Sequence, residues 1–208
     1  MEAGSKPGPQ ANGAGEPLDK ERSRICRKAC DYIRRYPQRQ AAVAKLSQPP
    51  SPAGLREPSL TSEVTPRRAV IVLDTNVVLD WLLFNDPSST SFAAAIASRQ
   101  LRWVASPAMR GELAAVLVRG LSASRRADPA AVLAAWDAHA EEVAEPPRLP
   151  VAVALRCTDP DDQKFLDLAH VAQARWLLSR DRAVLRLAKH AARLHIMITV
   201  PERWSILE

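Results

Sequence analysis

Acidic side chains follow two apolar segments of the chain at the points where these segments end. Asp74 comes directly after residues 70–73, which are four aliphatic side chains, and Asp181 lies shortly after the apolar segment 176–178. An unbroken aliphatic run is typical of a parallel strand that is buried on both faces. Because ligands of open α/β sheets bind at the edge where the strands end, we expect both aspartates at that edge.

Glu112 is a third acidic candidate. It follows a predicted strand over 101–105 and lies in a helix that we expect to begin at Ser106-Pro107. Serine is a good N-cap residue, and proline suits the first helical position. Glu112 then falls in the second turn of the helix, close to the same edge of the sheet. Taken alone, it could equally be a solvent-exposed helix residue.

The segment Asp159-Pro160-Asp161-Asp162 brings three more acidic residues to the start of a predicted helix. Carboxylates in a first helical turn cap free amides and complement the helix dipole, which accounts for Asp159 and for one of the other two. Three like charges so close together are costly unless a cation compensates them. Either Asp161 or Asp162 therefore joins the candidate site.

Carboxylates gathered at one sheet edge predict a site for a divalent cation. Hard oxygen ligands suit Mg²⁺ or Mn²⁺ better than zinc. No HExxH motif, CxxC pair or pair of histidines at ligand spacing competes with this prediction. A phosphatase or phosphotransfer domain that uses a strand-end aspartate is the alternative enzyme class, but Asn76 and Asp181 stand where such domains need an aspartate and a lysine.

Predicted strands alternate with predicted helices along the second part of the chain. The helices are expected over 77–84, from Pro107, over the alanine-rich segment 128–144, from Asp159 and over 183–191. Alternation of this kind predicts an α/β fold with a small parallel sheet flanked by helices on both faces. Trp136 is expected on the buried or partner-facing side of the alanine-rich helix.

These motifs, taken in order, resemble the PIN domain ribonucleases, and within that family the VapC-like toxin components of toxin-antitoxin systems. The resemblance covers residues 68–207 and rests on six motifs. They are Leu73-Asp74-Thr75-Asn76, Ser106-Pro107 with Glu112, Asp159-Pro160-Asp161-Asp162, Lys164-Phe165-Leu166, Ser179-Arg180-Asp181, and the closing strand and turn over 198–202. The resemblance implies a three-layer sandwich and metal-dependent cleavage of single-stranded RNA.

The resemblance also assigns roles. Asp74, Glu112 and Asp181 match the family's acidic positions, and Asp162 is preferred to Asp161 as the remaining metal ligand and catalytic acid. Thr75 or Asn76, together with Ser179, matches the polar positions that orient a carboxylate or a metal-bound water. Arg110-Gly111 departs from the family pattern just before Glu112.

Two basic residues are candidates for contacts with phosphate. Arg180 and Lys164 flank acidic candidates, and a local ion pair is the alternative interpretation of Arg180. The mechanism implied is hydrolysis of a phosphodiester in which a metal ion activates water and stabilises charge on the phosphate.

Residues 1–67 differ in composition from the nuclease-like domain expected over 68–208. Nine of the 17 prolines lie in this extension, which we expect to be largely disordered, with a possible helix over 18–46. Residues 1–68 hold 13 Lys or Arg and 7 Asp or Glu, whereas residues 69–208 hold 16 of each. All of the net positive charge therefore lies in residues 1–68, and this basic extension could bind phosphate backbone or serve solubility or a protein partner.

The sequence also gives expectations for the cellular location and the binding partners of the protein. Three cysteines give no disulfide framework, and the start of the chain has no apolar core of a signal peptide, so we expect a soluble cytoplasmic protein without a membrane span. The resemblance implies single-stranded RNA as substrate, a cognate antitoxin and a homodimer. The alternative function is a non-catalytic module that keeps the PIN fold and binds nucleic acid or a partner.

Overall fold

The computed structural model describes residues 68–121, 128–147, 149 and 155–206, and every structural statement below concerns these residues. The extension over 1–67, with the helix expected over 18–46, lies outside the described residues.

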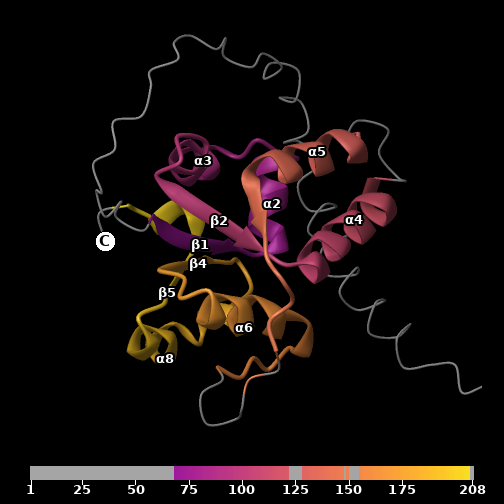
Figure 1. Ribbon diagram of the computed structural model, residues 1–208. Coiled ribbons are helices and arrows are strands. Elements are labelled where there is room, and N and C mark those ends of the chain that lie inside the picture. The colour runs from indigo at the N-terminus through magenta and orange to yellow at the C-terminus, as the bar shows by residue number, and fades with distance from the viewer. Residues whose placement is uncertain (1–67, 122–127, 148, 150–154, 207–208) are drawn as a thin grey trace, which may run out of the picture.

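Five parallel strands form the central sheet, in the order β3-β2-β1-β4-β5 (Figure 1). In chain order the strands are β1 (Ala69–Leu73), β2 (Leu101–Ala105), β3 (Ala140–Glu142), β4 (Trp176–Leu178) and β5 (Met197–Thr199). The chain builds outward from β1 to β2 and β3 and then crosses to the other side of β1 with β4. This reversal opens a crevice beyond the carboxyl ends of β1 and β4, where open α/β sheets bind ligands.

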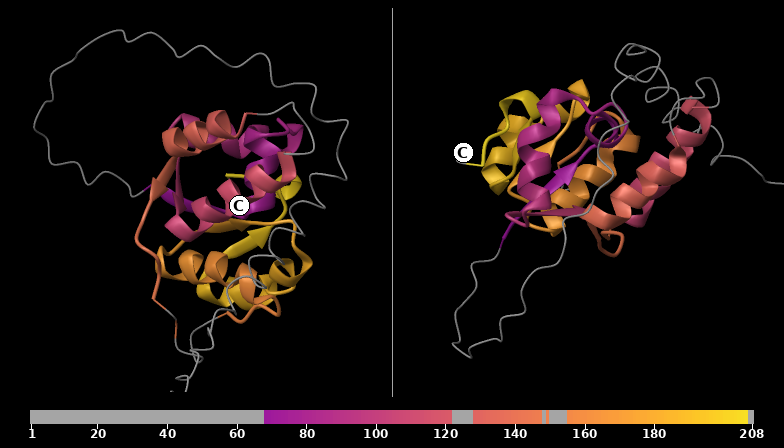
Figure 2. Two further views of the ribbon diagram at one scale, coloured as in Figure 1. Left: turned by 90° about the vertical axis from the view of Figure 1, so that its right-hand side faces the viewer. Right: turned by 90° about the horizontal axis from the view of Figure 1, so that it is seen from above.

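Helices cover both faces of the sheet (Figure 2). One face carries α2 (Thr75–Leu82) and α3 (Thr90–Ala97), and the other carries α6 (Gln163–Val171) and α8 (Ala188–Ala191). The helices α4 (Pro107–Leu121) and α5 (Pro129–His139) pack on one another beside β3, and α4 also contacts α2 and α6. The predicted α/β sandwich with a parallel sheet between two helical layers is confirmed.

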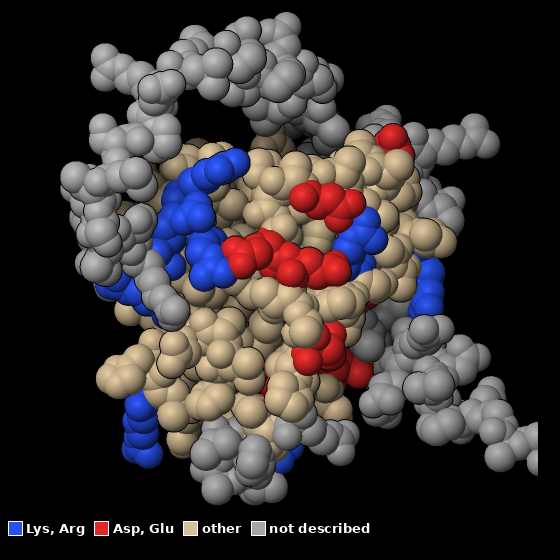
Figure 3. Space-filling model, in the orientation of Figure 1, with Lys and Arg blue, Asp and Glu red and all other residues tan. Residues whose placement is uncertain are grey.

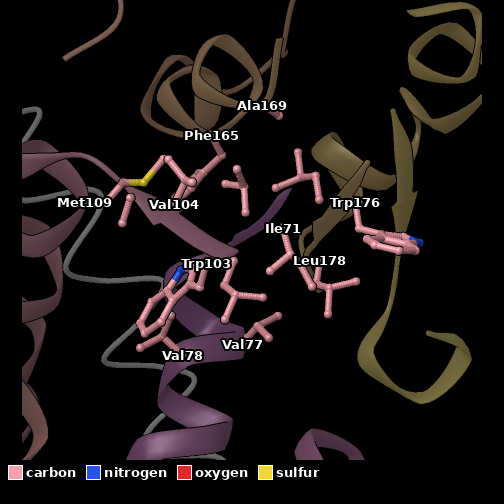
Figure 4. Close-up of a cluster of buried hydrophobic side chains, with 14 of the residues drawn as sticks. Ile71, Val77, Val78, Trp103, Val104, Met109, Phe165, Ala169, Trp176 and Leu178 are labelled. Carbon is pink, nitrogen blue, oxygen red and sulfur yellow. The ribbon is translucent and has the colours of Figure 1, made fainter. Parts of the chain in front are cut away.

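Alternation along the strands sends successive side chains to the two helical layers (Figure 4). Trp103 of β2 points toward Val77 and Val78 of α2, whereas its neighbour Val104 points toward Phe165 of α6. All five of these side chains are at most 2% exposed. Strands buried on both faces explain why residues 70–73 carry no polar alternation.

Aromatic rings form a continuous chain on the α2 and α3 side of the sheet. Trp81 of α2 contacts both Trp103 and Phe92, with ring centroids 5.5 and 5.8 Å apart. The chain continues at both ends, from Trp103 to Trp136 at 4.6 Å, and from Phe92 through Trp204, which lies 5.7 Å from Trp176. Edge-on ring contacts of this kind add about 0.5–1.5 kcal/mol each to the effect of burial.

Two helix predictions were wrong in extent. The helix expected over 128–144 ends at His139, because Ala140 adopts an extended conformation and the next residues pair with β2 as the edge strand β3. Its predicted start is confirmed, since the Asp128 carboxylate accepts a hydrogen bond from the backbone N–H of Ala130. Pairing with the exposed edge of β2 outweighs the helix preference of alanine, which is at most about 1 kcal/mol per residue.

The helix expected over 183–191 is divided in two. It forms α7 (Arg182–Leu185) and α8, and it continues as the 3₁₀ helix η4 (Ala192–Leu194). Leu187, with ψ near −3°, separates α7 from α8, so that both Val184 and Ala191 are buried. The remaining predicted elements lie within two residues of their expected ends.

Candidate active site

Three adjacent strands end at the same level, and a polar residue follows each of them. Ile71 of β1 pairs with Trp103 of β2, and Leu73 pairs with Leu178 of β4. One residue beyond the strands, this register places Asp74 between Ser106 and Ser179. Because residues at one level of a parallel sheet share a face, the three side chains point toward the layer that contains α6.

Asp74 is held at this position by the end of β4. Its backbone N–H donates to the carbonyl of Leu178 at 2.9 Å, and its carboxylate Oδ2 accepts a 2.6 Å hydrogen bond from the Ser179 hydroxyl. The same hydroxyl accepts a hydrogen bond from the backbone N–H of Asp181 at 2.9 Å. Asp74 also precedes α2 as its N-cap residue, but its side chain caps no amide there. One serine therefore links two of the acidic positions.

Glu112 reaches the site from α4. This helix runs without a break across Gly111, so Glu112 occupies its second turn as expected. Its Oε2 lies 2.7 Å from Nζ of Lys164, and both side chains are largely buried, with 11% of Glu112 and 16% of Lys164 exposed. Lys164 Nζ also donates to the backbone carbonyl of Asp161. Lys164, a candidate for phosphate contacts, is thus an internal partner of an acidic candidate.

The other acids divide into capping residues and site candidates. Asp159 accepts from the backbone N–H of Asp161 at 3.1 Å and caps the 3₁₀ helix η3 (Pro160–Asp162), as its alternative interpretation predicted. Asp181 Oδ1 accepts from the backbone N–H of Ala183 at 2.6 Å and caps α7. Burial raises the pKa of the Cys157 thiol, and the charges of Asp162, Asp159 and Asp181 raise it further. These three aspartates therefore lie near the thiol, and the choice of Asp162 over Asp161 stays a prediction.

The electrostatic environment of Asp74 ties these residues together. Burial raises the pKa of Asp74 from 3.8 to about 6, and the Ser179 hydrogen bond opposes this shift. The negative charges of Glu112 and Asp181 raise the pKa further, and the positive charge of Lys164 lowers it. Carboxyl groups from two other segments, Glu112 and Asp181, therefore lie close enough to influence the buried carboxyl of Asp74.

No group of three or more His, Cys, Asp or Glu side chains in the described residues is arranged as it stands to hold a metal ion. Each of three acidic candidates has a partner within the protein: Lys164 contacts Glu112, Ser179 donates to Asp74, and the Ala183 amide donates to Asp181. The donor chemistry nevertheless fits a hard cation, since the oxygens come from carboxylates with one buried carboxyl at their centre. Ser106 adds a fully buried hydroxyl whose Oγ has no hydrogen-bond partner among the described residues.

Arg180 and Asp80 form an ion pair, of which the sequence analysis singled out Arg180 alone. Arg180 Nε lies 2.5 Å from Oδ2 of Asp80 in α2, and its Nη1 lies 2.7 Å from Oε1 of Glu202. Its Nη2 also donates to the Ser88 hydroxyl at 3.0 Å. Arg180 is therefore engaged in ion pairs, but these partners are distant in sequence, whereas the expected pair was local. Asp80 could not be recognised beforehand, because a lone acid in an apolar helix gives no sign of its distant partner.

Asn76, the other residue expected to support the site, is partly buried in the first turn of α2. It lies two residues after Asp74, at the same end of the sheet.

The fold is a parallel α/β sheet with acidic residues after β1 and β4, and helices supply two further acidic candidates. The chain belongs to the PIN domain family, because the family model described as PIN domain matches residues 70–183. The match contains all the acidic candidates. Searches of the curated proteins and of the solved structures each gave no match. PIN domains are generally nucleases that act on nucleic acids with divalent metal ions.

A helix that crosses a membrane must be both long and apolar. Of the helices in the described part of the chain, none combines the length and the apolar character that crossing a membrane requires.

Proposed function

We propose that the protein is an endoribonuclease that hydrolyses single-stranded RNA with Mg²⁺ or Mn²⁺. The observation that carries this proposal is the buried carboxyl of Asp74, which lies at the carboxyl edge of a PIN-family sheet within the electrostatic influence of Glu112 and Asp181. Buried acids of like charge are costly to ionise together, and a divalent cation relieves that cost.

In this proposal each acidic residue has a role. Asp74, Glu112, Asp162 and Asp181 would hold the cation, with Asp161 as the alternative to Asp162. When bound, the cation would polarise the phosphate and lower the pKa of water. Ser179 keeps the Asp74 carboxylate oriented through its 2.6 Å hydrogen bond, and Asn76 lies beside it in α2. The Ser106 hydroxyl, buried and without a hydrogen-bond partner among the described residues, is free to bind water or phosphate oxygen.

Cleavage of a defined single-stranded RNA by the purified full chain tests the proposal. We expect cleavage with Mn²⁺ or Mg²⁺, none with EDTA, and much slower cleavage when the same RNA is annealed to its complement. Binding of the RNA without cleavage under any of these metal conditions would instead support the alternative function, a non-catalytic module with a PIN fold.

The resemblance to toxin components supports a narrower form of the proposal. In that form the nuclease is cytoplasmic and homodimeric, and an antitoxin holds it inactive. Co-expression with genes adjacent to its own, followed by purification and a cleavage assay, would test whether such an inhibitor exists.

Replacement of Lys164 is expected to strengthen metal binding. Its ammonium group contacts Glu112 at 2.7 Å, so a cation at the proposed site must displace or share this contact. In Lys164→Met the positive charge is gone, and we expect Mn²⁺ to bind at least about tenfold more tightly, which corresponds to about 1.4 kcal/mol. Isothermal titration calorimetry with MnCl₂ measures this without any need for RNA cleavage.

Lys189→Met is the matched control for this prediction, because Lys189 is exposed on α8 and carries the same charge. We expect its Mn²⁺ affinity to equal that of the parent. If both variants bind Mn²⁺ as the parent does, Lys164 does not compete for the site.

A further inference from the structure

The segment that connects β4 to β5 is basic throughout. Between residues 182 and 201 the sequence contains four Lys or Arg residues and no Asp or Glu. The four cations are Arg182, Arg186, Lys189 and Arg193, and all of them are exposed. Val184 of α7 and Ala191 of α8 are buried, so these two helices turn their apolar side to the sheet and their basic side to solvent.

None of these four cations forms an ion pair with another described residue. Three other arginines do form ion pairs: Arg102 with Glu141, Arg110 with Asp137, and Arg180 with Asp80 and Glu202. Unpaired like charges repel one another at close range. A row of them remains available to a polyanion.

The topology determines the direction of this row. The segment begins beside Asp181 at the carboxyl edge of the sheet, and Met197, at its far end, pairs with Trp176 at the amino edge. The helices between them must therefore carry the chain from the candidate site along the side of the molecule. Figure 1 shows α8 beside β5, at the opposite end of the sheet from α4 and α5.

The opposite side of the molecule is acidic. Residues 128–147 contain five Asp or Glu and no Lys or Arg. Figure 3 shows acidic side chains across the face in front of β3, where Asp137, Glu141, Glu142 and Glu145 are exposed. Arg102 and Arg110 neutralise Glu141 and Asp137 on this side, which leaves it a smaller negative charge. The side of α8 therefore attracts a polyanion more strongly.

We propose that Arg182, Arg186, Lys189 and Arg193 form a track that binds the phosphate backbone of single-stranded RNA as it leaves the candidate site. This inference deepens the proposed function and rests on it. Phosphate contacts of this kind fix the position of the strand without reading its sequence. They also make the affinity depend on salt through the release of counterions.

The test compares two pairs of arginines in the full chain. Arg186→Gln/Arg193→Gln removes two unpaired cations from the track, and Arg102→Gln/Arg110→Gln removes two paired cations elsewhere. Binding of a fluorescent single-stranded RNA is measured by anisotropy in EDTA over a series of salt concentrations. For the track variant we expect weaker binding and a salt slope lower by about 1.4, because each phosphate that a protein neutralises on a single strand adds about 0.7 to the slope.

Equal slopes for the two variants, or no binding of RNA by the parent, would overturn the track. Unchanged melting temperatures would show that both variants remain folded. Because binding is measured without metal, it is independent of cleavage. If the parent cleaves RNA with Mn²⁺ but the two variants have equal salt slopes, the proposed function stands and the track is wrong. If the salt slopes differ but the parent never cleaves RNA, the track stands and the proposed reaction is wrong.

Discussion

Asp74→Asn is expected to abolish metal-dependent cleavage of RNA by this protein. The substitution keeps the shape of the side chain and its hydrogen bond to Ser179 but removes the charge from the centre of the acidic group. Loss of outer partners of a metal ligand costs about 10–100-fold, so loss of a ligand charge should cost at least about a hundredfold. Cleavage rates with Mn²⁺ for parent and variant measure the effect, and equal rates would mean that the site has been assigned wrongly.

The same variant provides its own control for folding, because it should gain stability. The pKa of Asp74 is about 6 in the folded protein against an ordinary value of 3.8, so the folded state binds this proton more tightly than the unfolded state. Stability from this group is present below about pH 4 and is lost as pH rises to about 6. At pH 7.5 in EDTA, Asp74→Asn should therefore be more stable than the parent by up to about 3 kcal/mol, at 1.36 kcal/mol per pKa unit. At pH 4 most of this difference should disappear in urea denaturation, and a variant that is less stable at both pH values would contradict the burial of this charge.

Arg180→Met is expected to destabilise the fold by about 3 kcal/mol, because it removes one partner of a buried ion pair. The Asp80 side chain is 2% exposed and would lose the guanidinium that lies 2.5 Å from its carboxylate. Arg180 also joins α2 to Glu202 and lies between Ser179 and Asp181, so its anchoring holds the end of β4 that serves the site. Urea denaturation measures the decrease in free energy of unfolding.

Two variants make this result specific. Arg110→Met breaks an ion pair with Asp137 in which both side chains are at least 36% exposed, and we expect a decrease below about 1 kcal/mol. Asp80→Asn/Arg180→Met removes both charges and should recover part of the stability. If Arg180→Met costs no more than Arg110→Met, the buried pair does not stabilise the protein.

The strand ends could be predicted because a buried parallel strand leaves a simple pattern. Four aliphatic residues followed by Asp74 can hardly be placed elsewhere than at the carboxyl edge of a sheet. The short edge strand β3 leaves no such pattern, since Ala140-Glu141-Glu142 is typical of the end of an alanine-rich helix. Its pairing depends on the exposed edge of β2, which is distant in sequence.

The side-chain contacts within the site likewise could not be predicted from local sequence. Local sequence singled out Asp74, Glu112 and Asp181 as candidates, because each follows a recognisable strand or cap. It could not reveal that Lys164 pairs with Glu112 or that Arg180 pairs with Asp80, since these pairs are 52 and 100 residues apart. Side-chain partners across such separations follow from the assembled layers, not from local periodicity.

The aromatic chain on the α2 side of the sheet determines which part of the protein its tryptophan fluorescence monitors. All five tryptophans lie between residues 81 and 204, and ring contacts through Phe92 connect them. Excitation can pass along rings at such spacing, so intrinsic fluorescence follows the α/β domain as one unit. Residues 1–67 contain no tryptophan and therefore add no emitter of that kind to the signal.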